Sequence, residues 1–477
     1  MPTEPLRSID RDLLQVGTPS SLPIRPLTRT TTPTTRTARR SLPSWRRTLL
    51  ATGLTLALAA CGGSGGESDD GERLSQDSTD TAELQTLDRT KAGSAQASQR
   101  RPGAQASGSS SQPAATAAAS SHPRWTLTSP AEASRFLAQA SYGSSPKDIR
   151  ALTGRTANEW IETQFSRPAT SLLNTMRYWQ QRSGRAISLT DAHNAWWYST
   201  VQQDQLRQRV AFALSQIFVV STNGDVSHFP KGIASYYDML ARNAFGNFRQ
   251  LLEDVTLHPM MGVYLTHIGN HKERFDSTGK LTQAPDENYA REVMQLFTIG
   301  LEQLNLDGTP KKDAQGRPIP TYSNNDVIGL ARVFTGWSWN GGRLTHECFF
   351  RAGYCAENTN ERETRPMVAY DQYHSTLEKR FLGTTIAEGQ SSTTADLKVA
   401  LDTLFNHPNV GPFIGRQLIQ RLVTSNPSPA YVRRVASAFN NNGQGVRGDM
   451  KAVIRAVLLD EEARGDNARK QPSFGRI

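Results

Sequence analysis

The chain has 477 residues, enough by length alone for about three average domains, and 37% of them are hydrophobic. Its formal net charge is +10, of which residues 1–60 contribute +6 and residues 61–123 contribute −3, which leaves +7 for residues 124–477. A surplus of that size without a clustered run of Lys and Arg after residue 124 excludes a nucleic-acid footprint, so the sequence predicts no nucleic-acid partner.

Residues 1–60 have the pattern of an export leader. Arg46 and Arg47 precede an apolar run from Leu49 to Ala60, which is followed directly by Cys61. Positive charge, a short apolar run and small residues are typical of a signal peptide, and the run is shorter than the about 20 residues of a membrane span. The stretch Leu58-Ala59-Ala60-Cys61 resembles a bacterial lipobox, which implies that the sulfur of Cys61 carries a diacylglycerol.

The export route and the final location follow from the flanks of this run. Paired arginines before two leucines resemble a twin-arginine signal, although Leu49 stands where that signal usually has Phe, so the ordinary secretory route stays open. No Met occurs between Met1 and Met176, and the true start can lie downstream of Met1. Gly62 after the cysteine implies the outer membrane. We therefore expect an exported protein, anchored there by lipid and facing the periplasm or the exterior.

Residues 61–123 are predicted to be a disordered tether. They are rich in Gly, Ser, Thr, Gln and Ala and have almost no aromatic or branched apolar residue. Such a segment cannot bury enough surface to fold and acts as a flexible linker. Residues 124–477 have a globular composition and are predicted to form the body.

The body is predicted to be all-α, because helix-start patterns recur along it. A hydroxyl or carboxyl N-cap residue, often followed by Pro or by an acid three positions later, precedes six helical stretches. These N-cap residues are Ser129, Ser145, Thr156, Ser323, Ser428 and Asp449. Strand-like alternation is scarce, and residues 306–322 are predicted to form a small hairpin or loop.

Residues 285–300 are predicted to form one helix with an N-cap at Asp286. Its apolar residues recur at the spacing of a buried face. They are Tyr289, Val293, Leu296, Phe297 and Gly300. Two polar pairs lie four residues apart on this helix, Glu287 with Arg291 and Asn288 with Glu292.

Four polar residues are candidates for catalysis. A carboxylate beside an apolar stripe must be paired, hydrogen-bonded or shifted in pKa, and catalysis uses the shifted state. Glu292 is therefore a candidate acid or base, with Asn288 and Arg291 beside it; the alternative is a structural salt bridge or a solvated helix edge. His374 lies in a loop-rich segment, where functional residues concentrate, and its alternative is an ordinary surface histidine.

Metal and cofactor signals are weak. His267 and His271 are four residues apart, as in a helical metal site, but Gly269 weakens the helix and a solvated helix end is the alternative. The motifs of common hydrolases, nucleotide enzymes and c-type haem proteins do not occur. The sequence predicts no cofactor.

Cys348 and Cys355 remain once Cys61 is assigned to lipid. In an oxidising compartment they are expected to close a small disulfide loop. The alternative is a metal site, for which His346 is the only further ligand close in sequence.

Two other patterns leave alternatives open. The aromatic residues Trp196, Trp197 and Tyr198, and the pair Trp337 and Trp339, either pack in the core or stack on sugars. His-Pro pairs at His258 and His407 each follow one apolar helix and precede another. They represent either a helix-start device used twice or a duplicated half whose histidines face one cleft.

Several motifs together resemble the bacterial family called domain of unknown function 1800. The motifs are Arg135-Phe136-Leu137, Leu206-Arg207-Gln208-Arg209-Val210, Ala244-Phe245-Gly246-Asn247-Phe248, the stretch 285–300, Ala331-Arg332-Val333-Phe334-Thr335-Gly336-Trp337 and Arg421-Leu422-Val423-Thr424-Ser425-Asn426-Pro427. The resemblance implies an exported helical protein and an exported partner of the phosphatase-superfamily-like type. The resemblance implies that members usually continue beyond the point that corresponds to Ile477, so we expect a truncated or frameshifted reading frame here.

Two functions are consistent with these residues. The first is a membrane-tethered scaffold or assembly factor that holds an exported partner. The second is a hydrolase acting on a cell-envelope or extracellular polymer, with Glu292 as acid or base. The first is preferred, because the sequence does not supply a complete catalytic set.

Overall fold

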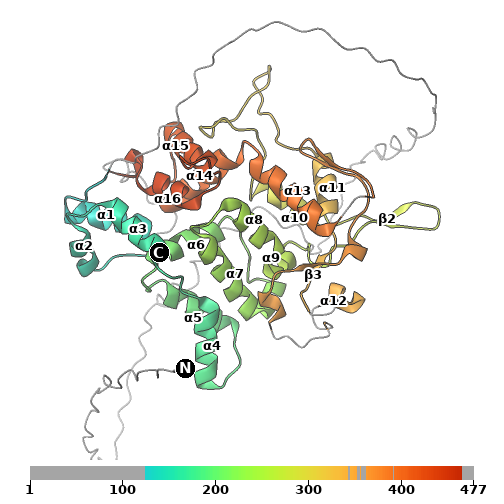
Figure 1. The fold of residues 1–477 in the computed structure, drawn as a ribbon, viewed down its shortest axis with the longest axis horizontal. Helices are drawn as coiled ribbons and strands as arrows, with labels where there is room; N and C mark the ends of the chain where they lie inside the picture. Colours follow the sequence, from blue (N-terminus) through green and yellow to red (C-terminus); the bar gives the residue numbers. More distant parts are fainter. Residues whose placement is uncertain (1–123, 342–343, 352–354, 356–360, 390–391, 465–477) are drawn as a thin grey trace, which may run out of the picture. The chain divides into compact units, whose positions relative to one another are not determined.

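The computed structural model describes residues 124–341, 344–351, 355, 361–389 and 392–464, which all belong to one unit of the chain, Ser109–Ile477. The predicted all-α class is confirmed, since helices dominate these residues (Figure 1). The helices are α1 (Pro130–Ala140), α2 (Pro146–Leu152), α3 (Ala157–Ser166), α4 (Leu172–Ser183), α5 (Leu189–Ser199), α6 (Gln205–Ser215), α7 (Pro230–Asn243), α8 (Phe248–Leu257), α9 (Pro259–Tyr264), α10 (Asn288–Gln295), α11 (Asn324–Val333), α12 (His346–Phe350), α13 (Thr393–Asn406), α14 (Val410–Leu422), α15 (Pro429–Asn440) and α16 (Met450–Leu458). None of the described helices is long and apolar enough to cross a membrane.

The strands are short and form antiparallel pairs. The pairs are β1 (Arg274–Phe275) with β2 (Leu281–Gln283), β3 (Trp337–Ser338) with β4 (Val368–Ala369), and β5 (Lys379–Phe381) with β6 (Thr384–Ile386). Residues 301–321 fold back on themselves, with the Gln303 N–H donating to the Ile319 carbonyl at 2.8 Å and the Lys311 N–H to the Gln303 carbonyl at 2.7 Å. The hairpin or loop predicted for residues 306–322 coincides with most of this segment.

The predicted N-caps start helices as expected. The side chains of Ser129, Ser145, Thr156, Ser428 and Asp449 each accept a backbone N–H from the first turn of the following helix. At Ser145 the Asp148 carboxylate also accepts the Ser145 N–H at 2.9 Å, which closes the capping box. At α1 the acid has a different partner, because Glu132 accepts the Thr128 N–H at 2.7 Å.

The last helices pack against the first ones. Helices α14, α15 and α16 pack on one another, and α16 also contacts α1 and α3, although more than 280 residues separate them in sequence (Figure 1). Gln139 Nε2 on α1 donates to the Ala463 carbonyl at 3.0 Å, and Arg455 pairs with Glu162 at 2.7 Å. Helices α6, α7 and α8 pack in series along the chain, and their inward residues belong to the hydrophobic core.

Helix α10 is shorter than predicted. It spans Asn288–Gln295, and Glu287 rather than Asp286 is the residue before it. Tyr289, Val293 and Phe297 are buried as predicted, but Leu296 is 40% exposed. Leu296 lies just after the end of the helix at Gln295, although its N–H still donates to the Glu292 carbonyl at 2.9 Å.

The two His-Pro pairs both precede a helix, but they are placed differently: His258 is the N-cap of α9, whereas α14 begins at Val410, after the N-cap residue Asn409. His258 Nδ1 accepts the Met260 N–H at 3.2 Å, and His407 Nδ1 accepts the Asn409 N–H at the same distance. Their other contacts differ: His258 Nε2 lies 3.3 Å from Ser235 Oγ, whereas the His407 carbonyl accepts from Arg447. Because the two histidines have different surroundings, these contacts favour a helix-start device that is used twice. The alternative, a duplicated half whose histidines face one shared cleft, is less consistent with them.

The tryptophans divide between core and surface. Trp337 and Trp339 are buried, in agreement with core packing. Trp197 is 55% exposed and Tyr198 is 45% exposed, so the core interpretation is wrong for these two residues. Only Trp196 of that run packs inward, against Tyr142 and Phe212.

Candidate functional site

Glu292 lies on the buried side of α10 and is 8% exposed. Its Oε2 is buried and accepts no hydrogen bond from the described residues. Burial raises the pKa of the Glu292 carboxyl above its ordinary value of 4.5, and the Arg291 guanidinium opposes this shift. Arg291 Nη2 is paired with Glu287 Oε2 at 3.2 Å, so the predicted pair of Glu287 with Arg291 is present.

Asn288 and Glu292 do not act together as the sequence suggested. Asn288 is exposed, and its Nδ2 lies 3.5 Å from Thr266 Oγ1. Thr266 has a φ of +61°, which is unusual for a β-branched residue, and its hydroxyl donates to Asp286 Oδ2 at 2.8 Å. Asn288 therefore helps to attach the segment after α9 to the start of α10.

Tyr322 is the other titratable group beside Glu292. Burial raises the pKa of Tyr322, Arg291 lowers it, and the negative charge of Glu292 raises it further. The Tyr322 hydroxyl donates to Gln295 Oε1 at 3.2 Å. A carboxyl of raised pKa near a phenol and a guanidinium can exchange a proton closer to neutral pH than an ordinary glutamate.

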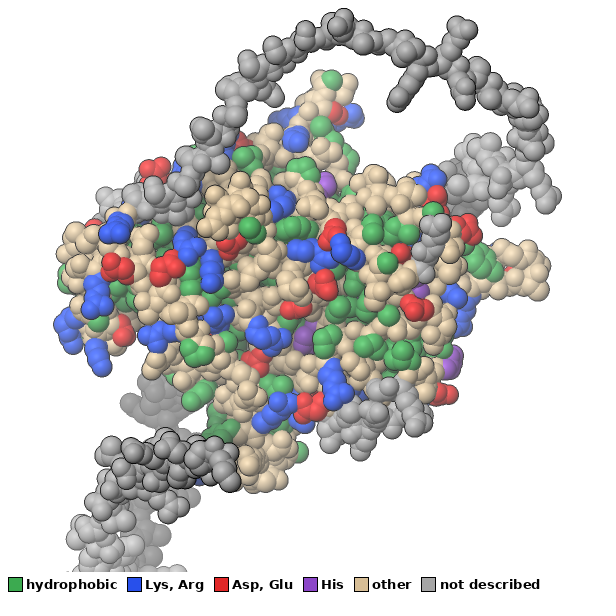
Figure 2. Space-filling view, in the orientation of Figure 1, with side chains coloured by type: hydrophobic (Ala, Val, Ile, Leu, Met, Phe, Trp, Pro, Cys, Tyr) green, Lys and Arg blue, Asp and Glu red, His purple; other side chains and the backbone are tan. Residues whose placement is uncertain are grey.

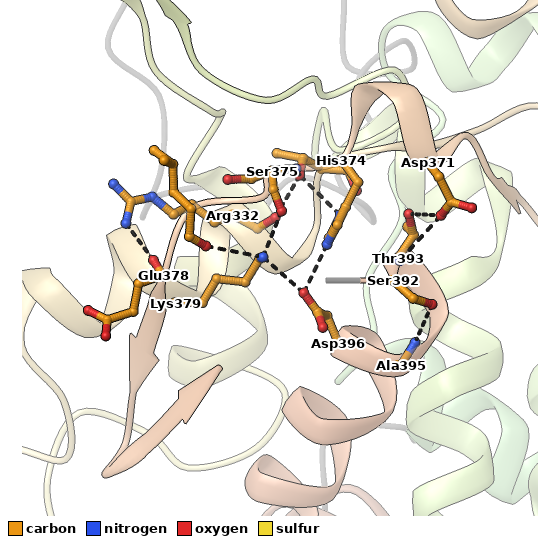
Figure 3. Close-up of polar contacts among 12 residues, drawn as sticks. Arg332, Asp371, His374, Ser375, Glu378, Lys379, Ser392, Thr393, Ala395 and Asp396 are labelled. Carbon is orange, nitrogen blue, oxygen red and sulfur yellow. Dashed lines mark hydrogen bonds and ion pairs between the residues drawn. The ribbon is translucent and has the colours of Figure 1, made fainter. Parts of the chain in front are cut away.

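His374 is buried, with 2% of its surface exposed, so its interpretation as a surface histidine is wrong. It follows the 3-10 turn η4 (Asp371–Tyr373) and points toward α13 (Figure 3). Its Nδ1 lies 2.8 Å from the Thr335 carbonyl, and its Nε2 lies 3.0 Å from Asp396 Oδ2. Both ring nitrogens face acceptors inside the protein and are therefore engaged.

Lys379 completes a buried charged group with His374 and Asp396, which we call the Asp396 cluster. Lys379 Nζ lies 2.9 Å from Asp396 Oδ2 and donates to the carbonyls of Ser375 at 2.7 Å and Leu377 at 3.3 Å. These three acceptors satisfy the three donors of an ammonium group. Burial raises the pKa of Asp396, but hydrogen bonds from His374 and Lys379 outweigh it and hold the pKa below its ordinary value of 3.8.

A second set of contacts surrounds the Asp396 cluster (Figure 3). Ser375 Oγ donates to Glu273 Oε2 at 2.8 Å, and Glu273 is paired with Arg332 at 2.7 Å. Arg332 Nη1 donates to the Glu378 carbonyl at 2.7 Å. Residues 371–380 are thus fixed to α11 on one side and to α13 on the other.

The Asp396 cluster is closed to solvent. His374, Lys379 and Asp396 are 2%, 0% and 3% exposed. Its polar contacts come from residues 335 and 375–377 and from α13, whereas Glu292 is bordered by Arg291 and Tyr322. The four predicted catalytic residues are therefore distributed over two separate polar groups.

Comparison with protein families gives one match. The model described as "Protein of unknown function (DUF1800)" covers residues 135–474, which is more than half of the chain. The chain belongs to the DUF1800 family. Comparison with curated proteins and with solved structures gave no match.

His267 and His271 do not share a helix in this DUF1800 protein, because α9 ends at Tyr264. His267 Nε2 lies 2.8 Å from the Thr256 carbonyl, its ring stacks on Tyr289 at 3.9 Å, and burial lowers its pKa to about 4. His271 Nδ1 contacts the Lys272 carbonyl. Within the described ranges, no group of three or more His, Cys, Asp or Glu side chains is placed to hold a metal ion.

Cys348 and Cys355 are joined by a disulfide. Gly341 packs directly on it, because a Cβ at that position would lie 2.2 Å from Cys355 Cβ and 2.6 Å from Cys348 Sγ. Cys61, the export leader and the tether lie outside the described residues.

Sequence reasoning missed Lys379, Asp396 and Tyr322. Lys379 lies in a strand of the short β5–β6 hairpin, and Asp396 in the first turn of α13, where an acid is favourable for the helix dipole alone. Charged residues in such places are normally solvated. Their burial results from a contact between segments that are distant in sequence, and the sequence contains no local signal of it.

Proposed function

We propose that this DUF1800 protein is an exported lipoprotein that acts as a membrane-tethered scaffold or assembly factor for an exported partner. The leader of residues 1–60 and the cysteine that follows it, Cys61, support the lipid anchor, and the tether of residues 61–123 supports the reach from the membrane. The observation that favours binding over catalysis is the engagement of the polar side chains: Asp396 holds His374 and Lys379, and Glu287 holds Arg291.

Exposed aromatic side chains on α4 and α5 supply a surface for that partner. Tyr178, Trp197 and Tyr198 are each about half exposed, and Val201, just after α5, is 74% exposed. Neighbouring rings support two of them, since Trp197 packs edge-on against Trp196 and Tyr198 against Trp179. Rigid exposed aromatic residues are frequent anchors of protein interfaces. The partner we propose is the exported phosphatase-superfamily-like protein that the family resemblance implies.

The test is purification of the tagged full chain from membranes. We expect wild type in the membrane fraction together with a stoichiometric exported partner, and Cys61→Ser in the soluble fraction because the lipid is lost. Trp197→Ala with Tyr198→Ala should stay in the membrane fraction and recover at least about tenfold less partner, since interface aromatic anchors contribute about 2 kcal/mol or more.

The matched control is Phe275→Ala, an aromatic residue of β1 that is 51% exposed and lies outside the α4–α5 surface. It should recover the partner as wild type does. Equal loss in the control, or membrane binding that does not depend on Cys61, would contradict the proposal.

Glu292 supports the alternative of a hydrolase acting on a cell-envelope or extracellular polymer. The specific observation is its unpartnered Oε2 together with its raised pKa. If Glu292 is the acid or base, Glu292→Gln should lower the hydrolysis of purified peptidoglycan or extracellular polysaccharide by roughly 10²–10⁴-fold.

Glu292→Gln is expected to lower hydrolysis but to raise the stability of the fold at pH 7. A carboxyl whose pKa is raised in the folded state contributes stability at low pH and loses it as pH rises through the folded pKa. Glu292→Gln should therefore unfold at a higher temperature than wild type at pH 7, and the difference should narrow toward pH 4. Glu287→Gln is the control, because that carboxylate is only partly buried and is paired with Arg291. A loss of stability at pH 7 in Glu292→Gln would assign a structural role to Glu292.

A further inference from the structure

A cavity of about 800 Å³ opens beside α3, between the α1–α2 loop and the α5–α6 turn. A second cavity of about 220 Å³ adjoins it along α3 and shares four lining residues with the first. These four are Asp148, Trp160, Gln164 and Arg167. We call the two adjoining cavities the α3 groove. Its size falls in the range of about 300–1,000 Å³ that is usual for small-molecule sites.

Gln164 presents an unused amide to the groove. It is 4% exposed, and its Oε1 accepts the Leu206 N–H at 3.2 Å, which fixes the orientation of the amide. No hydrogen bond to its Nε2 is made within the described residues, although Gln164 lines both cavities. The solvent in the groove reaches this Nε2, so a ligand bound there can accept its hydrogens.

Arg167 presents a cation that pairs with no carboxylate of the described residues. Its Nη1 donates to Gln203 Oε1, and its Nε is buried with no hydrogen bond in the described part of the chain. Two carboxylates line the groove. Asp148 accepts the N–H and hydroxyl of Ser145 at 2.9 and 2.6 Å, and Glu159 lies in the lining of the smaller cavity. Lys147 also lines the larger cavity. Lys and Arg side chains, interspersed with Asp and Glu, lie at this end of the body, around α1, α2 and α3 (Figure 2). Within the groove, Arg167 with its buried and unpartnered Nε is the position that favours an anionic group.

Two aromatic side chains form rigid walls of the groove. Trp160 packs edge-on against Phe136 at 5.3 Å. Tyr142 packs edge-on against Trp196 at 5.9 Å, and its hydroxyl donates to the Gln208 carbonyl at 3.1 Å. Fixed rings beside amide and guanidinium donors suit a ligand with both C–H faces and polar substituents.

We propose that the α3 groove binds a carboxylated, N-acetylated glycan with the chemistry of a peptidoglycan strand stripped of its peptides, in which the lactyl carboxylate is free. Arg167 would pair with the carboxylate, Gln164 would donate to an acetamido or hydroxyl oxygen, and Trp160 would contact a sugar face. This inference rests on the proposed export, because the tether would place the groove in reach of the cell wall. It adds a second attachment point to the proposed scaffold.

A peptide strand fits the groove less well. The lining residues come from α1, α2, α3, the α5–α6 turn and the start of α6, and none of these segments is a strand with a free edge for a peptide to pair with. The lining also contains few aliphatic side chains that could form pockets for peptide side chains, Leu137 and Val201 in the larger cavity and Ala151 and Leu152 in the smaller one.

The test is calorimetric titration of the full chain with two matched sugars. The first is the disaccharide of N-acetylglucosamine and N-acetylmuramic acid, and the second is N,N′-diacetylchitobiose, which lacks the carboxylate. We expect the first to bind at least about tenfold more tightly, a difference of about 1.4 kcal/mol, and its affinity to fall with salt. Arg167→Ala should bring the two sugars to equal affinity.

Variants and controls separate the contributions. Gln164→Leu should weaken the binding of both sugars equally. Arg150 is an exposed arginine of α2 outside the groove lining, so Arg150→Ala should change the affinity for neither sugar. If Gln164→Leu fails to fold, the sugar preference of Arg167→Ala alone tests the proposal. Absence of binding by both sugars, an unchanged preference in Arg167→Ala, or tighter binding of the dipeptide alanyl-γ-glutamate would overturn the proposal. The titration needs neither the lipid nor the partner, so its failure is distinguishable from failure of the scaffold proposal.

Discussion

Replacing Asp396 with alanine is expected to lower the free energy of unfolding by about 3–5 kcal/mol. The substitution leaves Lys379, which is fully buried, and His374, which is 2% exposed, without their shared carboxylate. A buried cation without a counter-charge must be desolvated at full cost. Urea unfolding of the full chain, followed by circular dichroism, measures the change.

Two comparisons separate the buried charges from general damage. Asp396→Leu combined with Lys379→Met removes both charges and should cost less than Asp396→Ala alone, because no unpaired ion remains. Lys398→Met breaks an exposed pair in the same helix, Lys398 with Asp402, and should cost less than about 1 kcal/mol. A double variant as unstable as the sum of its single variants would show that the Asp396 cluster is not coupled.

The same cluster predicts a pH dependence. The pKa of Asp396 is below its ordinary value of 3.8 in the folded state, because hydrogen bonds from His374 and Lys379 outweigh the effect of burial. A carboxyl with a lowered folded pKa contributes stability above its unfolded pKa and loses it as pH falls through the folded pKa. Wild type should therefore lose this contribution to its free energy of unfolding as the pH falls below 3.8, the ordinary pKa of the aspartate carboxyl. In that acidic range the free energy of unfolding of Asp396→Ala should depend less on pH.

Local signals in the sequence predicted the helix starts well. Ser145 and Asp148 form their capping box within four residues, so neighbouring side chains contain all the information that this helix start needs. The end of α10 was less predictable. Periodicity continues through Leu296 and Phe297 in the sequence, but the turn that ends the helix is set by the Ile299 and Gly300 N–H groups, which both donate to the Met294 carbonyl.

The candidate site was only partly predictable, because its chemistry depends on contacts between distant segments. The sequence identified Glu292 as a carboxylate beside an apolar stripe, and the structure places it there with an unpartnered oxygen. It did not indicate that His374 is held by Asp396 or that Lys379 is fully buried. Periodicity also could not separate Trp196, which packs inward, from Trp197, which is exposed, since adjacent helical positions differ by only about 100°.

Gly329 is expected to tolerate no side chain, because the backbone of β5 crosses α11 at this residue. A Cβ at position 329 would lie 1.8 Å from the Arg380 carbonyl oxygen and 2.7 Å from its carbon. The strand cannot move away easily. Arg332 donates to the Glu378 carbonyl and Asp326 accepts the Leu382 N–H, each at 2.7 Å, so α11 holds the hairpin on both sides of the crossing.

Gly329→Ala should therefore destabilise the protein by about 3 kcal/mol or more, at the upper end of overpacking effects, despite a gain of about 1 kcal/mol in helix propensity. Gly232→Ala in α7 is the matched control, because its new Cβ would meet the flexible Met260 thioether at 2.6 Å and the Glu363 carbonyl oxygen at 3.1 Å. Urea unfolding of both variants measures the difference. Since β5 also contains Lys379, Gly329→Ala should in addition displace this side chain from Asp396 and reduce the acid-dependent loss of stability. Equal stability of the two variants would mean that the hairpin moves without cost, and that α11 and the Asp396 cluster do not fix it in place.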